Sequence, residues 1–122
     1  MNHDEDDIQH TAFDQYRARG TSNSVLFAIP NGGKRDKKEA ARLKAQGVTA
    51  GVPDLFAASR GVGFFVEVKT TKGRVSPEQL AMHRRIKGAG DLDTFVVYGL
   101  DELLALLEDR GVLRADRAFI AA

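Results

Sequence analysis

Two strand-like segments near the middle of the chain limit its fold more than any other feature of the sequence. Residues 53–59 and 63–70 are rich in apolar, aromatic and β-branched residues, and the connection between them, residues 60–62, contains a glycine. So short a connection predicts that the two segments form an antiparallel hairpin. The residues that carry the chemistry of the chain lie in this hairpin.

The second segment has two faces of different character, because side chains alternate along a strand. One face carries Phe65, Glu67 and Lys69, and the other carries Phe64, Val66 and Val68. A charge removed from water is strongly destabilising unless it is paired or binds an ion. Glu67 and Lys69 are therefore expected to have a charged partner, a bound cation or a water-filled cleft beside them.

Asp54, at the start of the first segment, supplies a candidate partner. If Ala58 faces Gly63 across a four-residue loop, the same register puts Asp54 opposite Glu67. Two carboxylates about 5 Å apart repel each other unless a cation lies between them, and oxygen ligands suit Mg²⁺ or Mn²⁺. Lys69, roughly 7 Å farther along the same face, is then placed to contact a metal-bound water or a scissile phosphate. These groups together favour phosphodiester hydrolysis.

A purely structural interpretation fits the same spacing. In that interpretation Glu67 and Lys69 form an exposed salt bridge on an edge strand, and Asp54 is a turn residue. Because the pattern is short and its residue types are common, the spacing alone leaves both interpretations open.

Helix and strand patterns surround the hairpin. We expect helices at residues 4–19, 37–46, 76–87 and 101–110, and strands at residues 25–29 and 94–98. Ser76 and Gln79 form a predicted capping box at the start of the third helix. The order helix, strand, helix, hairpin, helix, strand, helix indicates a mixed sheet flanked by helices, of the α/β or α+β class. The chain length fits one domain, residues 1–122; the tail from Val112 onward is ambiguous.

Charge is balanced overall but unevenly distributed. The chain has 18 Lys and Arg against 17 Asp and Glu, with a basic middle between acidic ends. A basic run of this kind is either a solvated helix face or a surface that holds phosphates. The candidate phosphate-binding residues are Lys34, Arg35, Lys37, Lys38, Lys72 and Arg74.

The composition also bears on location and on other kinds of site. The chain has no cysteine and no apolar run of membrane-spanning length, so we expect a cytoplasmic protein without a membrane partner. His3, His10 and His83 lack the spacing of a zinc site and are expected at the surface. The sparse aromatic residues are expected in the core.

Three stretches of the sequence resemble a known family in both order and spacing. They are GVTAGVPDLF at residues 47–56, FVEVKT at residues 65–70 and SPEQ at residues 76–79. Together with the Pro-Asn-Gly turn at residues 30–32, they resemble the virus-type replication-repair nuclease (VRR-Nuc) domain of the PD-(D/E)xK superfamily. The resemblance runs from about Glu5 to Leu104 and implies a single α/β domain with a restriction-endonuclease-like mixed sheet flanked by helices.

The resemblance also implies roles for individual residues. Asp54 and Glu67 are implied to be metal ligands, with the backbone carbonyl of Val68 as a further ligand, and Lys69 to be the catalytic lysine. The implied metal is Mg²⁺, with Mn²⁺ as a substitute.

Two further residues are implied, and each has a structural alternative. Glu5 is implied to be an additional acid near the metal, but it lies among Asp4, Asp6 and Asp7, any of which also favours a helix N-terminus. Gln79 is implied to be an active-site residue, but its capping-box position offers it a purely structural role.

The implied function is that of a Mg²⁺-dependent, structure-selective DNA endonuclease in bacterial or phage-infected cells. The resemblance points to branched DNA or four-way junctions, to a homodimer, and to a Holliday junction resolvase. Two alternatives stay open: an exonuclease or restriction-type nuclease of the same superfamily, and a catalytically silent DNA-binding module.

Overall fold

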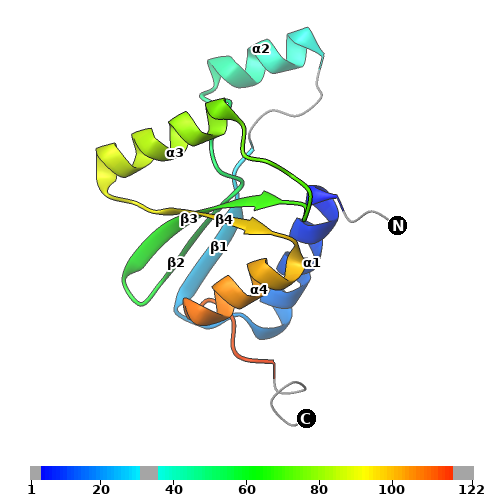
Figure 1. Cartoon of the computed structure of the whole chain (residues 1–122), viewed down its shortest axis with the longest axis vertical. Coiled ribbons are helices and arrows are strands. Elements are labelled where there is room, and N and C mark those ends of the chain that lie inside the picture. Colours follow the sequence, from blue (N-terminus) through cyan, green and yellow to red (C-terminus); the bar gives the residue numbers. More distant parts are fainter. Residues whose placement is uncertain (1–3, 31–35, 117–122) are drawn as a thin grey trace.

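The structure, a computed structural model, describes residues 4–30 and 36–116. In these residues a four-stranded mixed sheet is flanked by four helices (Figure 1). The elements are, in chain order, α1 (Glu5–Arg19), β1 (Ser24–Ala28), α2 (Lys37–Ala45), β2 (Leu55–Ser59), β3 (Val62–Lys69), α3 (Pro77–Gly90), β4 (Thr94–Tyr98) and α4 (Leu100–Asp109). This order and the mixed sheet confirm the predicted fold class.

The β2–β3 hairpin has the predicted register but a tighter turn. Ala58 pairs with Gly63 as expected, and the ladder continues to a pair between Ser59 and Val62. Only Arg60 and Gly61 remain in the turn, with φ angles of 58° and 79°. Positive φ at both positions is the geometry that matches the twist of a two-residue hairpin. The expected four-residue loop was therefore wrong, while the pairing that it served to derive was right.

Strand β3 lies in the interior of the sheet. The strand order is β1-β2-β3-β4, with β1–β2 and β2–β3 antiparallel and β3–β4 parallel. Helix α3 makes the crossover between the two parallel strands, as such a connection requires. The alternative of Glu67 and Lys69 on an edge strand is therefore wrong.

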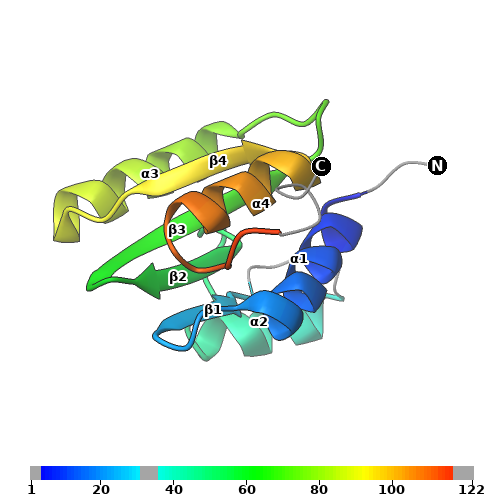
Figure 2. The same cartoon turned by 90° about the horizontal axis from the view of Figure 1, so that it is seen from below.

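One face of the sheet is covered by α1 and α4 (Figure 2). The apolar face of β3, with Phe64, Val66 and Val68, packs there into the core. The segment after α4, which the sequence left ambiguous, closes this layer, because Val112 and Leu113 are buried and Leu113 forms a bridge with Gly20.

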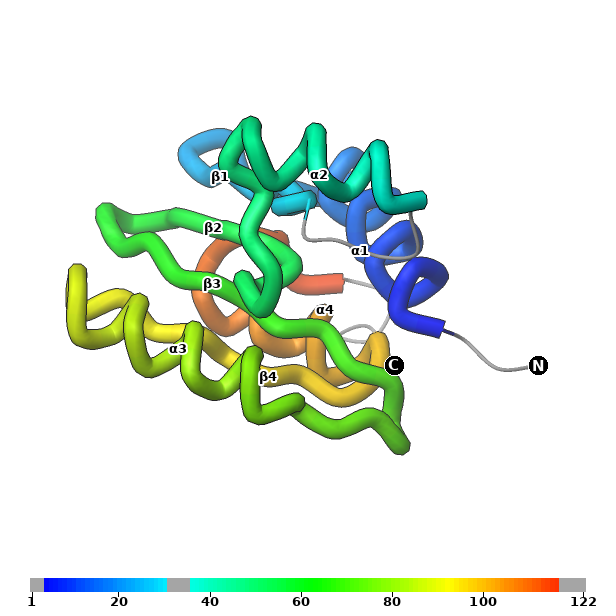
Figure 3. Tube along the Cα trace, turned by 90° about the horizontal axis from the view of Figure 1, so that it is seen from above, coloured from blue at the N-terminus to red at the C-terminus, as the bar shows by residue number. Residues whose placement is uncertain are grey.

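The opposite face of the sheet carries α3 and, farther out, α2 (Figure 3). Helix α2 buries none of its residues. This face is only partly covered, so the expectation that aromatic residues are in the core is confirmed for Phe64, which is 2% exposed, but wrong for Phe27 and Tyr98, which are 50% and 37% exposed. Within the described residues, no helix combines the length and the apolar character needed to cross a membrane.

Candidate active site

The carboxyl end of β3 presents two buried charged residues on the sheet face that α3 covers. Glu67 is 1% exposed and Lys69 is 7% exposed. Their neighbours on the strand, Val66 and Val68, point into the core on the other face, so strand alternation confirms the predicted separation of the two faces. Glu67 and Lys69 are therefore in the costly position that the sequence implied, and what surrounds them decides their role.

Asp54 lies in the bend before β2 and is tied to both neighbouring strands. Its Oδ2 accepts a hydrogen bond of 2.8 Å from the backbone N–H of Val68, and its backbone carbonyl accepts one of 2.8 Å from Ile29. Its carboxyl group is within hydrogen-bonding reach of Glu67. The structure thus brings Asp54 and Glu67 together as the register predicts, although β2 begins at Leu55, two residues later than predicted.

The contact between these two carboxyl groups changes the chemistry of Glu67. Burial, followed by the hydrogen bond and the negative charge of Asp54, raises the pKa of Glu67 to about 9, although Lys69 opposes the shift. At neutral pH the two groups therefore share a proton, as closely placed carboxyl groups do when no cation lies between them.

Glu5 joins this group from the first turn of α1. It is half-buried, and burial raises its pKa, with Lys69 opposing the shift and Asp54 adding to it. Asp4 serves instead as the N-cap of α1, where its side chain accepts a hydrogen bond from the N–H of Asp7. Among the clustered acids at this end, Glu5 is thus the one whose charge interacts with Asp54, Glu67 and Lys69.

Gln79 has both roles that the sequence offered as alternatives. Its Oε1 accepts a hydrogen bond of 2.9 Å from the N–H of Ser76, and the hydroxyl of Ser76 accepts one of 3.1 Å from the N–H of Gln79, which completes the predicted capping box. The Nε2 of the same side chain donates to Oε2 of Glu67 over 3.5 Å. Capping therefore fixes the amide in an orientation that aims its N–H donors at the site.

His83 is a site residue that the sequence interpretation missed. Its Nε2 lies 3.1 Å from Oε1 of Glu67, and its side chain is only 10% exposed, so the expectation of a surface residue was wrong. Burial, and next the charge of Lys69, lower the pKa of His83. The available signal was its position four residues after Gln79, since residues four apart on a helix share a face. His10 is exposed, as expected.

The groups gathered here fit a hard divalent cation. The donors are carboxylate oxygens, which Mg²⁺ and Mn²⁺ prefer, and a cation would replace the proton that Asp54 and Glu67 share. Continuing the β2–β3 register places Pro53 opposite Val68. Because proline has no N–H, strand β2 offers the Val68 carbonyl no donor there, which fits its implied role as a ligand. In the described part of the chain no group of three or more His, Cys, Asp or Glu side chains is arranged so that it could hold a metal ion, so the candidate ligands are two carboxyl groups and a backbone carbonyl.

Four of the predicted phosphate-binding residues are among those that the structure describes. Lys37 and Lys38 begin α2, Lys72 and Arg74 lie in the connection from β3 to α3, and all four are exposed. Figures 1 and 3 show α2 and that connection at the end of the sheet where β3 finishes. Lys34 and Arg35, and the turn at residues 30–32 beyond Pro30, lie outside the described residues.

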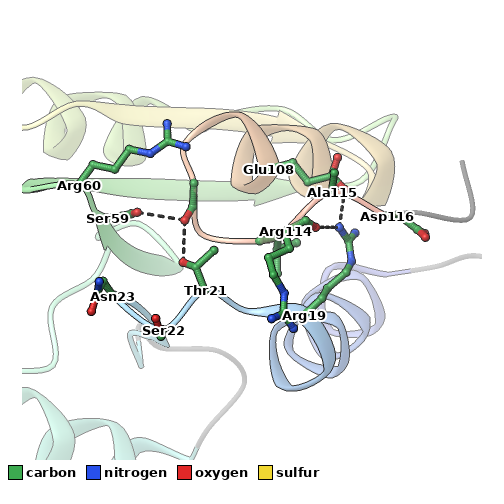
Figure 4. A pocket seen from close by; sticks show the side chains of 12 residues that line it. Arg19, Thr21, Ser22, Asn23, Ser59, Arg60, Glu108, Arg114, Ala115 and Asp116 are labelled. Atoms are coloured by element: carbon green, nitrogen blue, oxygen red, sulfur yellow. Dashed lines mark hydrogen bonds and ion pairs between the residues drawn. The ribbon is translucent and has the colours of Figure 1, made fainter. Parts of the chain in front are cut away.

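A second polar region lies at the other end of the hairpin, around a hollow of about 1120 Å³ (Figure 4). We call Thr21, Ser59 and Gly111 the turn-end cluster: the hydroxyls of Thr21 and Ser59 donate hydrogen bonds of 2.7 and 3.0 Å to the carbonyl of Gly111. Beside it, Arg19 binds the carboxylate of Glu108 at 2.6 Å and also donates to the carbonyl of Arg114. These contacts hold the segment after α4 against the sheet, which gives these side chains a structural role.

Comparison with known proteins decides the family. The profile of the VRR-NUC domain family matches residues 5–99, most of the chain. The chain belongs to the VRR-NUC family. One solved structure, described as a VRR_NUC domain protein, superposes with a TM-score of 0.69 at 22% identity, covering 87% of this chain and 86% of that one.

A second solved structure, described as a VRR_NUC domain, gives a TM-score of 0.55 at 26% identity and covers 85% of this chain and 94% of the other. No curated protein sequence matches the chain. The fold and the family of the VRR-NUC chain are therefore established, and its general type is that of a nuclease, for which DNA is the substrate.

Proposed function

We propose that this VRR-NUC chain is a metal-dependent DNA endonuclease that hydrolyses phosphodiester bonds. One observation supports this above all: Asp54 and Glu67 meet on one sheet face, beside Lys69 and within the electrostatic reach of Glu5. Like charges crowd together in the interior of a protein only where they bind an ion or do chemistry. Without metal the raised pKa of Glu67 relieves this crowding by protonation; a bound cation would let both carboxyl groups be ionised.

Asp54, Glu67 and the carbonyl of Val68 would hold Mg²⁺ or Mn²⁺, with Glu5 as an additional acid. The bound cation would supply Lewis-acid stabilisation of the charge on the phosphate and favour deprotonation of water. Lys69 would contact the non-bridging phosphate oxygens and offset the charge that grows as water adds to phosphorus. The bond from phosphorus to the leaving sugar oxygen then breaks, and that oxygen takes up a proton.

Residues of α3 would position the carboxylate of Glu67 for this chemistry. His83 contacts its Oε1 at 3.1 Å, and Gln79 approaches its Oε2 at 3.5 Å. With both oxygens engaged by one rigid helix, the side chain of Glu67 has a fixed direction. Outer contacts of this kind typically contribute 10- to 100-fold to metal affinity or activity.

Four exposed bases would bind the DNA backbone. Lys37 and Lys38 lie in α2, whereas Lys72 and Arg74 lie in the connection from β3 to α3, and contacts to phosphates recognise shape rather than sequence. We therefore favour structure-selective cutting of branched DNA. For a four-way junction, a homodimer acting as a Holliday junction resolvase would place two sites with twofold symmetry.

Two alternatives make different predictions. An exonuclease or restriction-type nuclease would share this site but shorten or cut linear duplex. A catalytically silent DNA-binding module would bind without cutting. The silent module is disfavoured because Asp54, Glu67 and Lys69 are all present and lie together on the described sheet.

Cleavage of labelled DNA tests the proposal. Linear duplex, a flap and a four-way junction are incubated with Mg²⁺, with Mn²⁺ or with chelator. Metal-dependent products are expected, reduced at least about 100-fold by Asp54→Asn and by Lys69→Ala. Asp6→Asn, at an exposed acid beside Glu5, is the matched control and is expected to cut like the wild type.

The products separate the alternatives. Paired symmetric nicks in the junction support a resolvase, and progressively shortened duplex supports an exonuclease. DNA binding without any metal-dependent product, in protein that is shown to be folded, contradicts the nuclease proposal.

A further inference from the structure

The last residue of β4 places an aromatic side chain beside Lys69. In the parallel β3–β4 ladder Lys69 pairs with Tyr98. Paired residues on neighbouring strands point to the same face of a sheet, with the strands about 4.8 Å apart. Tyr98 therefore stands on the face of the candidate active site, next to the residue assigned to the phosphate.

The backbone of Tyr98 is hydrogen-bonded on the strand, but among the described residues its hydroxyl has no hydrogen-bond partner. Its N–H donates to Oε1 of Glu102 at 2.9 Å, and the N–H of the following Gly99 donates to the carbonyl of Lys69 at 2.8 Å. The ring is 37% exposed, and within residues 4–30 and 36–116 its hydroxyl forms no hydrogen bond. A partly exposed tyrosine on a fixed strand, whose hydroxyl has no hydrogen bond within these residues, is available to a ligand.

Tyr98 differs in this respect from the other aromatic residues of the sheet. Phe64 and Phe95 pack edge to face in the core layer, with ring centroids 5.7 Å apart. Phe56 lies between Phe27 and Phe65, at 5.4 and 5.0 Å. Tyr98 takes part in no such ring pair among the described residues, and of these aromatic residues it is the one paired with Lys69.

The charges around Tyr98 indicate what kind of ligand fits. Lys69 lies on one side, and the methyl group of Thr71 lies against Gly99 on the other. The exposed bases Lys72 and Arg74 follow in the same connection. A tyrosine ring beside Lys69, with further bases in the adjoining connection, suits a nucleotide, whose base stacks on the ring while its phosphate meets the cations; the carboxylate of Glu102 is occupied by the backbone N–H of Tyr98.

We propose that Tyr98 stacks on an unpaired nucleobase next to the phosphate that Lys69 contacts. This inference rests on the proposed nuclease function and deepens it, because it names the feature of DNA that the site selects. In intact duplex every base is already stacked and paired, so a base reaches Tyr98 only after disruption of the helix. At a junction, flap or single-stranded segment the base is free at little cost, and stacking on Tyr98 then favours branched DNA.

The proposal is tested by substitutions that distinguish the effect of an aromatic ring from that of an apolar side chain without a ring. Tyr98→Phe keeps the ring, and Tyr98→Leu keeps an apolar side chain without it. Phe27→Leu, at an exposed aromatic residue of the opposite edge strand, is the matched control. Four-way junction and flap DNA carrying 2-aminopurine at the branch point are bound in chelator, so that no DNA is cut, and both fluorescence and affinity are measured.

We expect the wild type, Tyr98→Phe and Phe27→Leu to change the fluorescence of the 2-aminopurine base on binding, and Tyr98→Leu to leave it unchanged. Loss of one stacked base corresponds to roughly 5- to 100-fold weaker binding of branched DNA, whereas affinity for linear duplex should change by less than about twofold. With Mg²⁺ present, the preference of cleavage for branched over linear DNA should fall in parallel.

The outcomes distinguish the two proposals. If Tyr98→Leu matches the wild type in fluorescence, affinity and substrate preference, the stacking site is overturned while the nuclease stands. Fluorescence that depends on Tyr98 without any metal-dependent cutting supports the stacking site and overturns the nuclease. If Tyr98→Leu weakens the binding of branched and linear DNA equally, the stacking site is overturned, because the ring would then not select unpaired bases.

Discussion

At the turn end of the β2–β3 hairpin the buried hydroxyl of Ser59 donates to a carbonyl of the chain, whereas at the opposite end the buried carboxyl of Glu67 faces Asp54, another acid. The two ends belong to the same pair of strands. At the turn end the hydroxyls of Thr21 and Ser59 donate to the carbonyl of Gly111 and Arg19 meets Glu108, so folding alone explains these contacts. At the other end, folding alone leaves two acids sharing a proton. In this hairpin, buried polar side chains therefore indicate a functional site where groups of like charge meet, and not where hydrogen bonds or ion pairs satisfy them.

The largest effect that would test this comparison is expected at the contact between His83 and Glu67. His83→Ala is expected to lower the affinity for Mn²⁺ or Mg²⁺ roughly 10- to 100-fold, because Glu67 loses the contact that orients Oε1. Calorimetric titration of the metal gives the affinity independently of activity. His10→Ala, at an exposed histidine, is the control; equal affinities for the wild type and His83→Ala would show that this contact positions nothing.

The second test uses the pH dependence of stability. The folded state raises the pKa of Glu67 from 4.5 to about 9, so its contribution to stability is fully present below about 4.5 and is lost as the pH rises toward 9. Without metal, the free energy of unfolding should fall by more than about 1.4 kcal/mol over this range, since one pKa unit corresponds to that amount.

Urea titrations at a series of pH values measure this change. Glu67→Gln, which cannot ionise, should give a flatter pH profile, and divalent metal should restore stability most at high pH. A wild-type profile as flat as that of Glu67→Gln would contradict the shared proton between the two carboxyl groups.

A third test separates the two contacts of Gln79. Ser76→Ala removes the N-cap hydroxyl and should lower the free energy of unfolding by about 1 kcal/mol, but it leaves the amide near Glu67. Gln79→Ala should cause a similar loss and should also weaken metal binding. If the two variants bind metal equally well, the contact of Gln79 with Glu67 has no role in the site.

The smallest expected effect lies at the turn-end cluster. Thr21→Val removes a hydroxyl that donates to Gly111 and should lower the free energy of unfolding by about 1 kcal/mol. Because the hydroxyl serves only the fold, the rate of cleavage per folded molecule should be unchanged. A loss of cleavage larger than the loss of folded protein would mean that this end of the hairpin also takes part in function.

The sequence predicted best what depends on neighbours along the chain. The facing of Asp54 and Glu67 followed from the register of one hairpin, and the capping box of Ser76 and Gln79 followed from three residues of spacing. The predicted loop was too long because nothing in the sequence indicates that Arg60, a non-glycine residue, adopts a left-handed conformation. The contact of His83 with Glu67 depends instead on how α3 lies across the sheet, and one sequence pattern does not fix that angle.

The role of Glu5 was also beyond what a local sequence pattern can predict. Four acids in a row satisfy the helix dipole equally well, so local physics does not select among them. Only the packing of α1 against the sheet decides which of them faces Lys69, and that packing is set by apolar residues such as Ile8 and Ala12 on the same helix. The roles of these residues toward metal and DNA stay predictions until the experiments above are done.

Pro53, at the end of the hairpin, is a position where substitution has a consequence for the site. Among the standard amino acids only proline lacks the backbone N–H, so any replacement at this position supplies a donor opposite Val68. The strand ladder could then extend by one rung and occupy the carbonyl that the site leaves open. The sheet would become more regular at the expense of the proposed metal ligand; if Val68 has that role, selection for a stable sheet and selection for metal binding act in opposite directions on this one carbonyl.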